Sequence, residues 1–161
     1  METDKGVVYN QSNAILHYIG SKTGLYSDNL EERYWADWGI ETFNDLWSNG
    51  YYQVFFADAA PTEEKEKETI EKAAKFSGLL AKRLAHNDEK HFFGGDHMSI
   101  GDIKCFAAYC SIAFNDGVKH PKISEAIRHQ VTSDAHLNAW FERMNTHFAD
   151  YLKARPAPRP M

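Results

Sequence analysis

The sequence predicts a mainly α-helical protein, a bundle of helices preceded by one short β-type run. Apolar residues recur at spacings of three and four over most of the 161 residues, as they do on the buried faces of helices. The segment 103–114 carries one charge and is apolar on nearly all sides, which is typical of a helix enclosed by other helices. Because 43% of the residues are hydrophobic and 14% are aromatic, the chain can fill a hydrophobic core.

The composition argues against several kinds of partner. The net charge is −5 at pH 7 and no basic run exceeds two residues, so we expect no nucleic-acid surface. The 103–114 segment is too short for a membrane span. Cys105 and Cys110 are predicted to be buried, reduced thiols, and residues 1–6 show no targeting pattern. We therefore expect a cytoplasmic protein, and attachment of a larger assembly to an organelle stays open.

The N-terminal elements are a β-type run at 7–9 and a helix that begins near Gln11 and Ser12. This helix is predicted to end at Gly24, a residue type that suits the C-terminal cap. Where a strand leads into a helix, free backbone N–H groups, a hydroxyl and the positive end of the helix dipole converge, which suits one carboxylate. A plain helix cap is the alternative role for Ser12.

A long helix is predicted from about residue 30, and it carries an acidic ridge. Asp37, Glu41 and Asp45 recur every four residues along it. Like charges at this spacing repel each other, so the ridge needs water, counter-charges from another chain or a cationic ligand. A solvated face is the simpler interpretation.

The aromatic run after Gly50 has two interpretations. Tyr51, Tyr52 and Phe55 either pack into the core or line one wall of a hydrophobic pocket. The sequence leaves both open. Helical spacing then continues, and we predict further helices over 62–84, 122–130 and about 134–152.

Ser99 and Asp102 are predicted to start the central helix as a structural cap. The Ser99 side chain can accept from the backbone N–H of Asp102, and the Asp102 carboxylate can accept from the N–H of Ser99. Met98 and Ile103 occupy the two positions of a hydrophobic staple around this cap. The apolar segment therefore begins at a self-reinforcing turn, far from any expected ligand.

We expect no metal site and find no catalytic motif in the sequence. His86, His91 and His97 are five and six residues apart, and no pair of histidines has the spacing of a metal-binding helix. A glycine-rich phosphate loop, a Gly-x-Ser-x-Gly turn and tandem cysteine pairs are also missing from the sequence. The candidate chemistry is therefore confined to the polar N-terminal junction and the acidic ridge.

Three motifs, taken together, resemble the later part of glutathione S-transferases of the mu, pi and sigma classes. They are Gln11 to Leu16 with Gly24 to Tyr26, Gly94 to Ile103, and Ala139 to Arg143 with Tyr151 to Pro156. The resemblance covers almost the whole chain. It implies that residues 1–25 are a remnant of a thioredoxin-like glutathione-binding domain, its last strand and helix. Residues 26–161 are then an all-helical domain of the C-terminal type.

The resemblance also implies a glutathione site. In this family the residues matched by Gln11 and Ser12 hold the γ-glutamyl end of glutathione. An acidic residue of the first long helix reaches the glutathione site of the neighbouring subunit in a homodimer, and ungapped spacing places it at Asp45. Glutathione is thus the expected substrate, together with a small hydrophobic electrophile.

The catalytic residue of the family has no match here. The family's catalytic Tyr, Ser or Cys lies near the start of the thioredoxin-like domain, and one βαβ unit needs about 30 residues. Only ten residues precede Gln11, and Tyr9 is not at the catalytic position. We expect a glutathione S-transferase-like protein that is inactive over residues 1–161 alone. The alternative is a non-catalytic interaction or structural subunit of a larger assembly.

Overall fold

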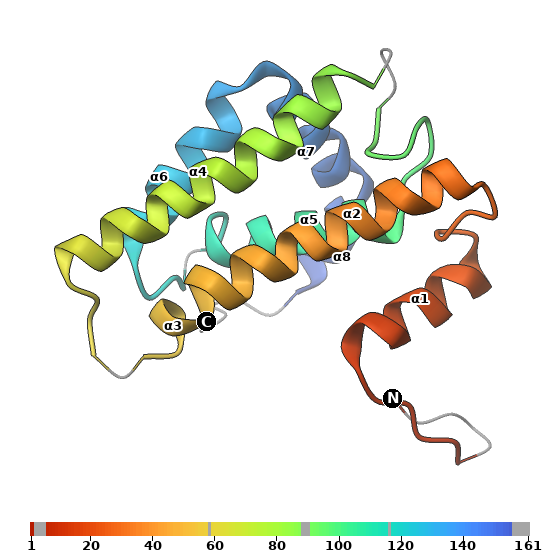
Figure 1. Ribbon diagram of the computed structural model, residues 1–161, viewed down its shortest axis with the longest axis horizontal. Helices are drawn as coiled ribbons and strands as arrows, with labels where there is room; N and C mark the ends of the chain where they lie inside the picture. Colours follow the sequence, from red (N-terminus) through yellow and green to blue (C-terminus); the bar gives the residue numbers. More distant parts are fainter. Residues whose placement is uncertain (2–5, 58, 88–90, 116, 156–161) are drawn as a thin grey trace.

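The structure is a computed structural model that describes residues 1, 6–57, 59–87, 91–115 and 117–155. They form an all-helical bundle, which confirms the predicted fold class (Figure 1). The helices are α1 (Ser12–Thr23), α2 (Leu30–Leu46), α3 (Tyr52–Phe55), α4 (Glu63–Ala85), α5 (Ile100–Ile112), α6 (Pro121–Ser133), α7 (Ala135–His147) and α8 (Ala149–Ala154). A π-helical turn, η1 (Trp47–Tyr51), joins α2 to α3. No helix of the described ranges is long and apolar enough to cross a membrane.

Side-chain caps fix where several of these helices begin. Asn29 accepts from the N–H groups of Glu31 and Glu32 at the start of α2. Thr62 and Asp134 do the same for α4 and α7. A cap of this kind satisfies backbone donors that have no partner within the helix. The start of each of these helices is therefore determined by the residues next to it in the sequence.

The central helix α5 packs most closely against α2, at small residues. Gly101 of α5 lies against Ala36 of α2, so close that a Cβ atom on Gly101 would sit 2.9 Å from the Ala36 Cα. Gly39 meets the ring of Phe93 in the same way, at 3.1 Å from a Cβ. On the other side, α5 contacts α7, while α4, α6 and α7 pack on one another. Cys105 and Cys110 of α5 are both buried, and neither forms a disulfide.

The turn before α5 contains the reciprocal capping box. The Asp102 N–H donates to Ser99 Oγ, and the Ser99 N–H donates to Asp102 Oδ2 at 3.0 Å. The other carboxylate oxygen, Oδ1, accepts from the Phe93 N–H at 3.1 Å and from Trp140 Nε1 at 3.0 Å. Burial raises the pKa of Asp102, while these donors act in the opposite direction. Asp102 thus ties the start of α5 to α7.

Two local expectations differ from the structure. The β-type run at 7–9 is only a single bridge residue, Val8, in the described part of the chain. An isolated pair of strands is marginal in water, because it lacks the further strands that would cover it. The last helix, expected to continue to 152, breaks at Phe148, whose ring stacks on Phe106 of α5 at 5.7 Å. The polar loop at 87–90 and the proline-rich tail lie largely outside the described residues.

Candidate functional site

The N-terminus of α1 has a strained backbone at Gln11. Gln11 has φ 67° and ψ 106°, a conformation that side-chain-bearing residues rarely adopt. Such strain persists only where the surrounding structure imposes it, and it clusters at ligand sites. No side chain caps α1, and Ser12 is exposed. The hydroxyl of Ser12 and the first-turn N–H groups therefore face outward at the positive end of the helix dipole.

Apolar contacts of α1 and of the loop that follows it attach the helix to the bundle. Leu16 of α1 and Leu25 and Tyr26 of the following loop pack on a small buried cluster formed by α2 and α5. Gly20 lies so close to Ile100 that a Cβ atom would sit 2.6 Å from its Cγ2. The chain then turns at Gly24, which adopts φ 78° as a left-handed C-cap. In Figure 1, α1 lies at the edge of the bundle, next to α2.

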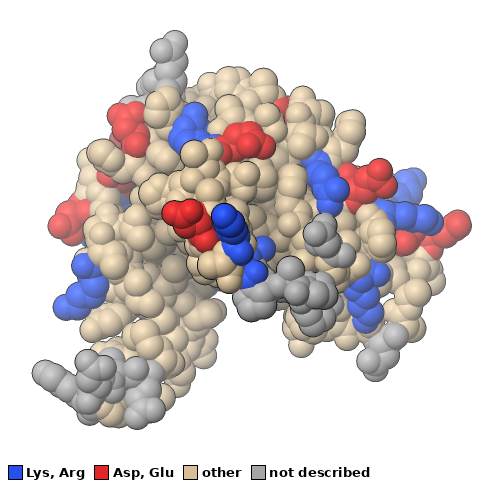
Figure 2. Space-filling model, turned by 180° about the vertical axis from the view of Figure 1, so that it is seen from behind, with Lys and Arg blue, Asp and Glu red and all other residues tan. Residues whose placement is uncertain are grey.

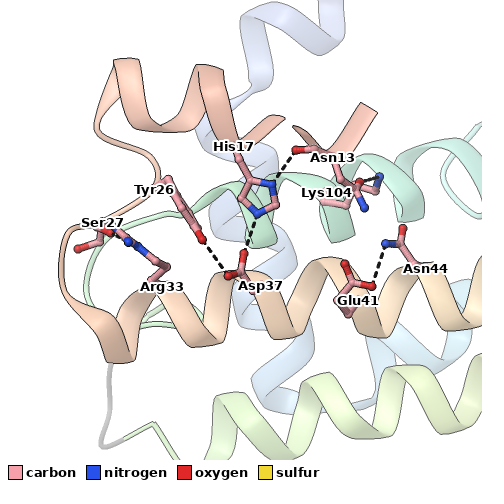
Figure 3. A network of polar contacts seen from close by, with 9 residues as sticks. All are labelled: Asn13, His17, Tyr26, Ser27, Arg33, Asp37, Glu41, Asn44 and Lys104. Atoms are coloured by element: carbon pink, nitrogen blue, oxygen red, sulfur yellow. Dashed lines mark hydrogen bonds and ion pairs between the residues drawn. The ribbon is translucent and has the colours of Figure 1, made fainter. Parts of the chain in front are cut away.

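The first half of α1 is held by polar contacts with α2 and α5 (Figure 3). His17 Nδ1 lies 2.7 Å from the backbone oxygen of Asn13, and His17 Nε2 lies 2.7 Å from Asp37 Oδ1. Lys104 Nζ donates to the Asn13 side-chain oxygen at 3.1 Å. Tyr26 donates its hydroxyl to Asp37 Oδ2 at 2.8 Å. Burial and this bond to the carboxylate raise the pKa of Tyr26 to about 12, so it stays protonated.

The acids of the predicted ridge lie in three different environments. Asp37 is half-buried and finds its partners within this chain, in His17 and Tyr26. Glu41 accepts from the side-chain amide of Asn44 at 3.3 Å. Asp45 is exposed and lines a cleft of about 400 Å³ between α2 and α4, together with Lys72 and Lys75. Glu41 and Asp45 are thus both exposed, whereas Asp37 is engaged within the chain.

The three aromatic residues singled out after Gly50 separate in the structure. Tyr51 and Phe55 are buried in the core and stack on each other at 5.2 Å, whereas Tyr52 is 56% exposed. Tyr52 stacks on Phe56 at 5.0 Å, and Trp47 lies beside both. The exposed aromatic surface is therefore formed by Tyr52 and Phe56, with the partly buried Trp47 beside them. Phe56 belongs to the same aromatic run in the sequence but was not among the predicted pocket residues, although its spacing of four from Tyr52 puts both on one helical face.

The surface beyond these residues has no continuous charge of one sign on the face shown in Figure 2. Acidic and basic side chains are interspersed there, and the projecting N-terminal part shows tan, uncharged side chains. Within the described ranges there is no group of three or more His, Cys, Asp or Glu residues that could hold a metal ion. The polar features that stand out are thus the start of α1 and the contacts that hold it.

Most of the chain matches the model of one protein family. Residues 44–155 match the model of the glutathione S-transferase C-terminal domain. The chain belongs to the glutathione S-transferase family. A comparison with curated proteins finds no significant match. The matched segment begins at residue 44, one residue before Asp45, so the α1 site lies outside it.

Solved glutathione S-transferases share the fold of this family member at low identity. The glutathione S-transferase from Ascaris lumbricoides aligns with a TM-score of 0.77 and 22% identity, over 99% of this chain and 74% of that one. The monomeric Na-GST-3 from Necator americanus gives 0.73 and 18%, over 98% and 74%. A Nu-class enzyme from Haemonchus contortus gives 0.73 and 21%, over 94% and 71%. These alignments include the region of α1.

Proposed function

We propose that this chain carries the γ-glutamyl half of a glutathione site at the N-terminus of α1. The observation that carries the proposal is the strained Gln11 beside the exposed Ser12 at an uncapped helix start. The α-carboxylate of glutathione would accept hydrogen bonds from the Ser12 hydroxyl and the first-turn N–H groups. In this proposal residues 1–25 are the end of a thioredoxin-like domain, and residues 26–161 are the all-helical domain.

Asp45 is proposed to serve the glutathione site of a second subunit in a homodimer. Its carboxylate is exposed on α2 and faces the α2–α4 cleft, so it is free to approach another chain. The γ-glutamyl end of glutathione carries an ammonium group next to its carboxylate, and an exposed acid suits that cation. Two chains would then each contribute Gln11 and Ser12 to one site and Asp45 to the other.

Residues 1–161 are proposed to lack the group that activates the glutathione thiol. Activation requires a donor that stabilises the thiolate and lowers its pKa. Tyr9, two residues before Gln11 in the sequence, stacks on Tyr18 at 5.0 Å, and its hydrogen bond to Tyr18 raises the pKa of Tyr9. Purified residues 1–161 should therefore not accelerate conjugation of a small hydrophobic electrophile. The exposed Tyr52 and Phe56, with the partly buried Trp47 beside them, are the apolar surface proposed to receive such a molecule in a complete enzyme.

A non-catalytic interaction or structural subunit is the second candidate function. The observation that favours it is the apolar exposure around α1, where Val8 is 72% exposed and Val7, Tyr18 and Ile19 are also open. Exposed apolar side chains grouped on one surface mark interaction sites. A partner subunit would cover this surface, in the cytosol or in an assembly on an organelle.

Calorimetric titration with glutathione separates the two candidates. The wild-type chain should bind glutathione, and Ser12→Ala should weaken binding by roughly tenfold or more, because a hydrogen bond to a charged group is lost. Ser21→Ala is the matched control, since it removes an exposed hydroxyl from the same helix and should leave the affinity unchanged. An absence of binding would reject the glutathione site and leave the interaction subunit. Equal affinities for all three proteins would reject the role of Ser12.

A further inference from the structure

Asn13, which directly follows Ser12, connects the first turn of α1 to the bundle through polar contacts. Its side-chain oxygen accepts from Lys104 on α5, and its backbone oxygen lies 2.7 Å from His17 Nδ1. His17 in turn contacts Asp37 on α2. The residues next to Asn13, Ser12 and Ala14, are exposed. Apolar packing therefore contributes little at this turn, and the polar ties fix its position.

Asp37 is the far anchor of these ties, because both of its oxygens are engaged. Oδ1 lies 2.7 Å from His17 Nε2, and Oδ2 accepts from the Tyr26 hydroxyl at 2.8 Å. The ring of Tyr26 also meets the His17 ring edge-on at 4.9 Å between centroids. Tyr26 therefore holds the carboxylate and the imidazole in one arrangement. A chain of contacts runs from Tyr26 through Asp37 and His17 to Asn13, as Figure 3 shows.

Each of the two contacts of His17 requires a proton on the ring nitrogen that makes it. Nδ1 faces a backbone carbonyl oxygen and Nε2 faces a carboxylate oxygen, and both are acceptors. A neutral imidazole has one N–H to donate and an imidazolium has two, so only the imidazolium completes both contacts. The charged groups near His17 are Asp37, Arg33 and Glu41 on α2 and Lys104 on α5. The neutral Tyr26 lies in the loop between α1 and α2.

We infer that Asp37 is a positioning residue for the γ-glutamyl site, acting through His17 and Asn13 on the turn that carries Ser12. This inference rests on the proposed function. Asp37 does not touch the ligand. It fixes the direction of the Ser12 hydroxyl and of the first-turn N–H groups, and so reduces the ordering that glutathione binding requires.

Two measurements on Asp37→Asn test the inference separately from the proposed function. Amide hydrogen exchange of residues 12–16 without glutathione reports the stability of the turn, and calorimetry reports glutathione affinity. Asp37→Asn should accelerate exchange and weaken binding by about tenfold each, because a charge-assisted contact is lost. Glu31→Gln, at the exposed start of the same helix, is the control and should change neither. Tyr26→Phe removes only one hydroxyl and provides the same test where Asp37→Asn does not fold.

The coupling between Asp37 and His17 distinguishes positioning from a general loss of stability. Since Asp37 acts through His17, the double variant Asp37→Ala with His17→Ala should bind glutathione no more weakly than whichever of the two single variants binds it more weakly. Glutathione binding with unchanged exchange and affinity in Asp37→Asn would overturn the inference alone. No glutathione binding by the wild type would overturn it together with the proposed function.

Discussion

At the scale of single residues, the carboxylate of Asp102 accepts hydrogen bonds from groups that are far apart in the sequence. Its donors are the N–H and hydroxyl of Ser99, the N–H of Phe93 and the indole of Trp140. All of these lie in the buried interior, where an unpartnered donor is costly. Asp102 therefore acts both as the cap of α5 and as a link between three segments of the chain.

Replacing Asp102 should destabilise the protein more than replacing its capping partner. Asp102→Ala leaves buried N–H groups of Phe93 and Trp140 without acceptors, and each unmade bond costs about 1–3 kcal/mol, so we expect a loss of roughly 3 kcal/mol or more. Ser99→Ala removes the cap alone, which costs about 0.5–2 kcal/mol. Urea unfolding measures both. Asp96→Ala, exposed in the same loop, is the control, and an Asp102→Ala midpoint equal to that control would contradict the prediction.

Glu68 makes the stability of the folded protein depend on pH. Hydrogen bonds from Lys65 and Lys72 lower the pKa of Glu68 to about 2 in the folded state, below its ordinary value of 4.5. A depressed pKa stabilises the folded state above pH 4.5, and this stabilisation is lost as the pH falls through about 2. Glu68→Gln should therefore lower the unfolding free energy at pH 7 and have a much smaller effect near pH 2. Glu71→Gln, whose ion pair with Lys67 is longer at 3.9 Å, should show a smaller difference at pH 7.

At the scale of helices, the crossing of α2 and α5 depends on residues without large side chains. Gly101 meets backbone atoms of Ala36, which cannot move aside as a flexible side chain can. Close-packed interiors resist even one added methyl group. The crossing distance is therefore set by Gly101, and the burial of α5 follows from it.

Two glycine-to-alanine substitutions should change the stability of the fold in opposite directions. Gly101→Ala should destabilise the fold by about 1–3 kcal/mol, because the added methyl group overpacks the α2–α5 contact. Gly78→Ala, in the middle of α4 with no heavy atom within 4 Å of a Cβ, should stabilise it by up to about 1 kcal/mol. Thermal unfolding compares them. Equal effects of the two substitutions would mean that helix propensity, and not the crossing, governs Gly101.

The helices were largely predictable because their signals are local. Ser99 and Asp102 lie within one turn, and Gly24 marks its own helix end. The break at Phe148 was missed because it depends on packing with Phe106, which lies 42 residues earlier. The same holds for the site. Gln11 and Ser12 were singled out from a local pattern and remain a prediction, whereas the contact of His17 with Asp37 joins positions 20 residues apart and is visible only in the folded chain.

At the scale of the whole molecule, the chain has one large core and a smaller attachment for α1. The large cluster unites α2 to α7, whereas the small one consists of Ala36, Ile40 and Ile100 with residues of α1 and its following loop packed on it. The proposed glutathione site lies on the smaller attachment. Its geometry therefore depends on how firmly α1 is held to α2 and α5, through the contacts of Asp37 and Lys104.

The most direct measurement is a titration of the ¹⁵N-labelled chain with glutathione, followed by NMR. The amide signals of Gln11, Ser12 and Asn13 should show the largest shifts and saturate together, and those of His17 and Asp37 should follow the same binding curve because they hold that turn. Cysteinylglycine, which lacks the γ-glutamyl group, should leave these signals unchanged. Shifts confined to the exposed aromatic surface of Trp47, Tyr52 and Phe56, or no shifts at all, would contradict a glutathione site at the start of α1.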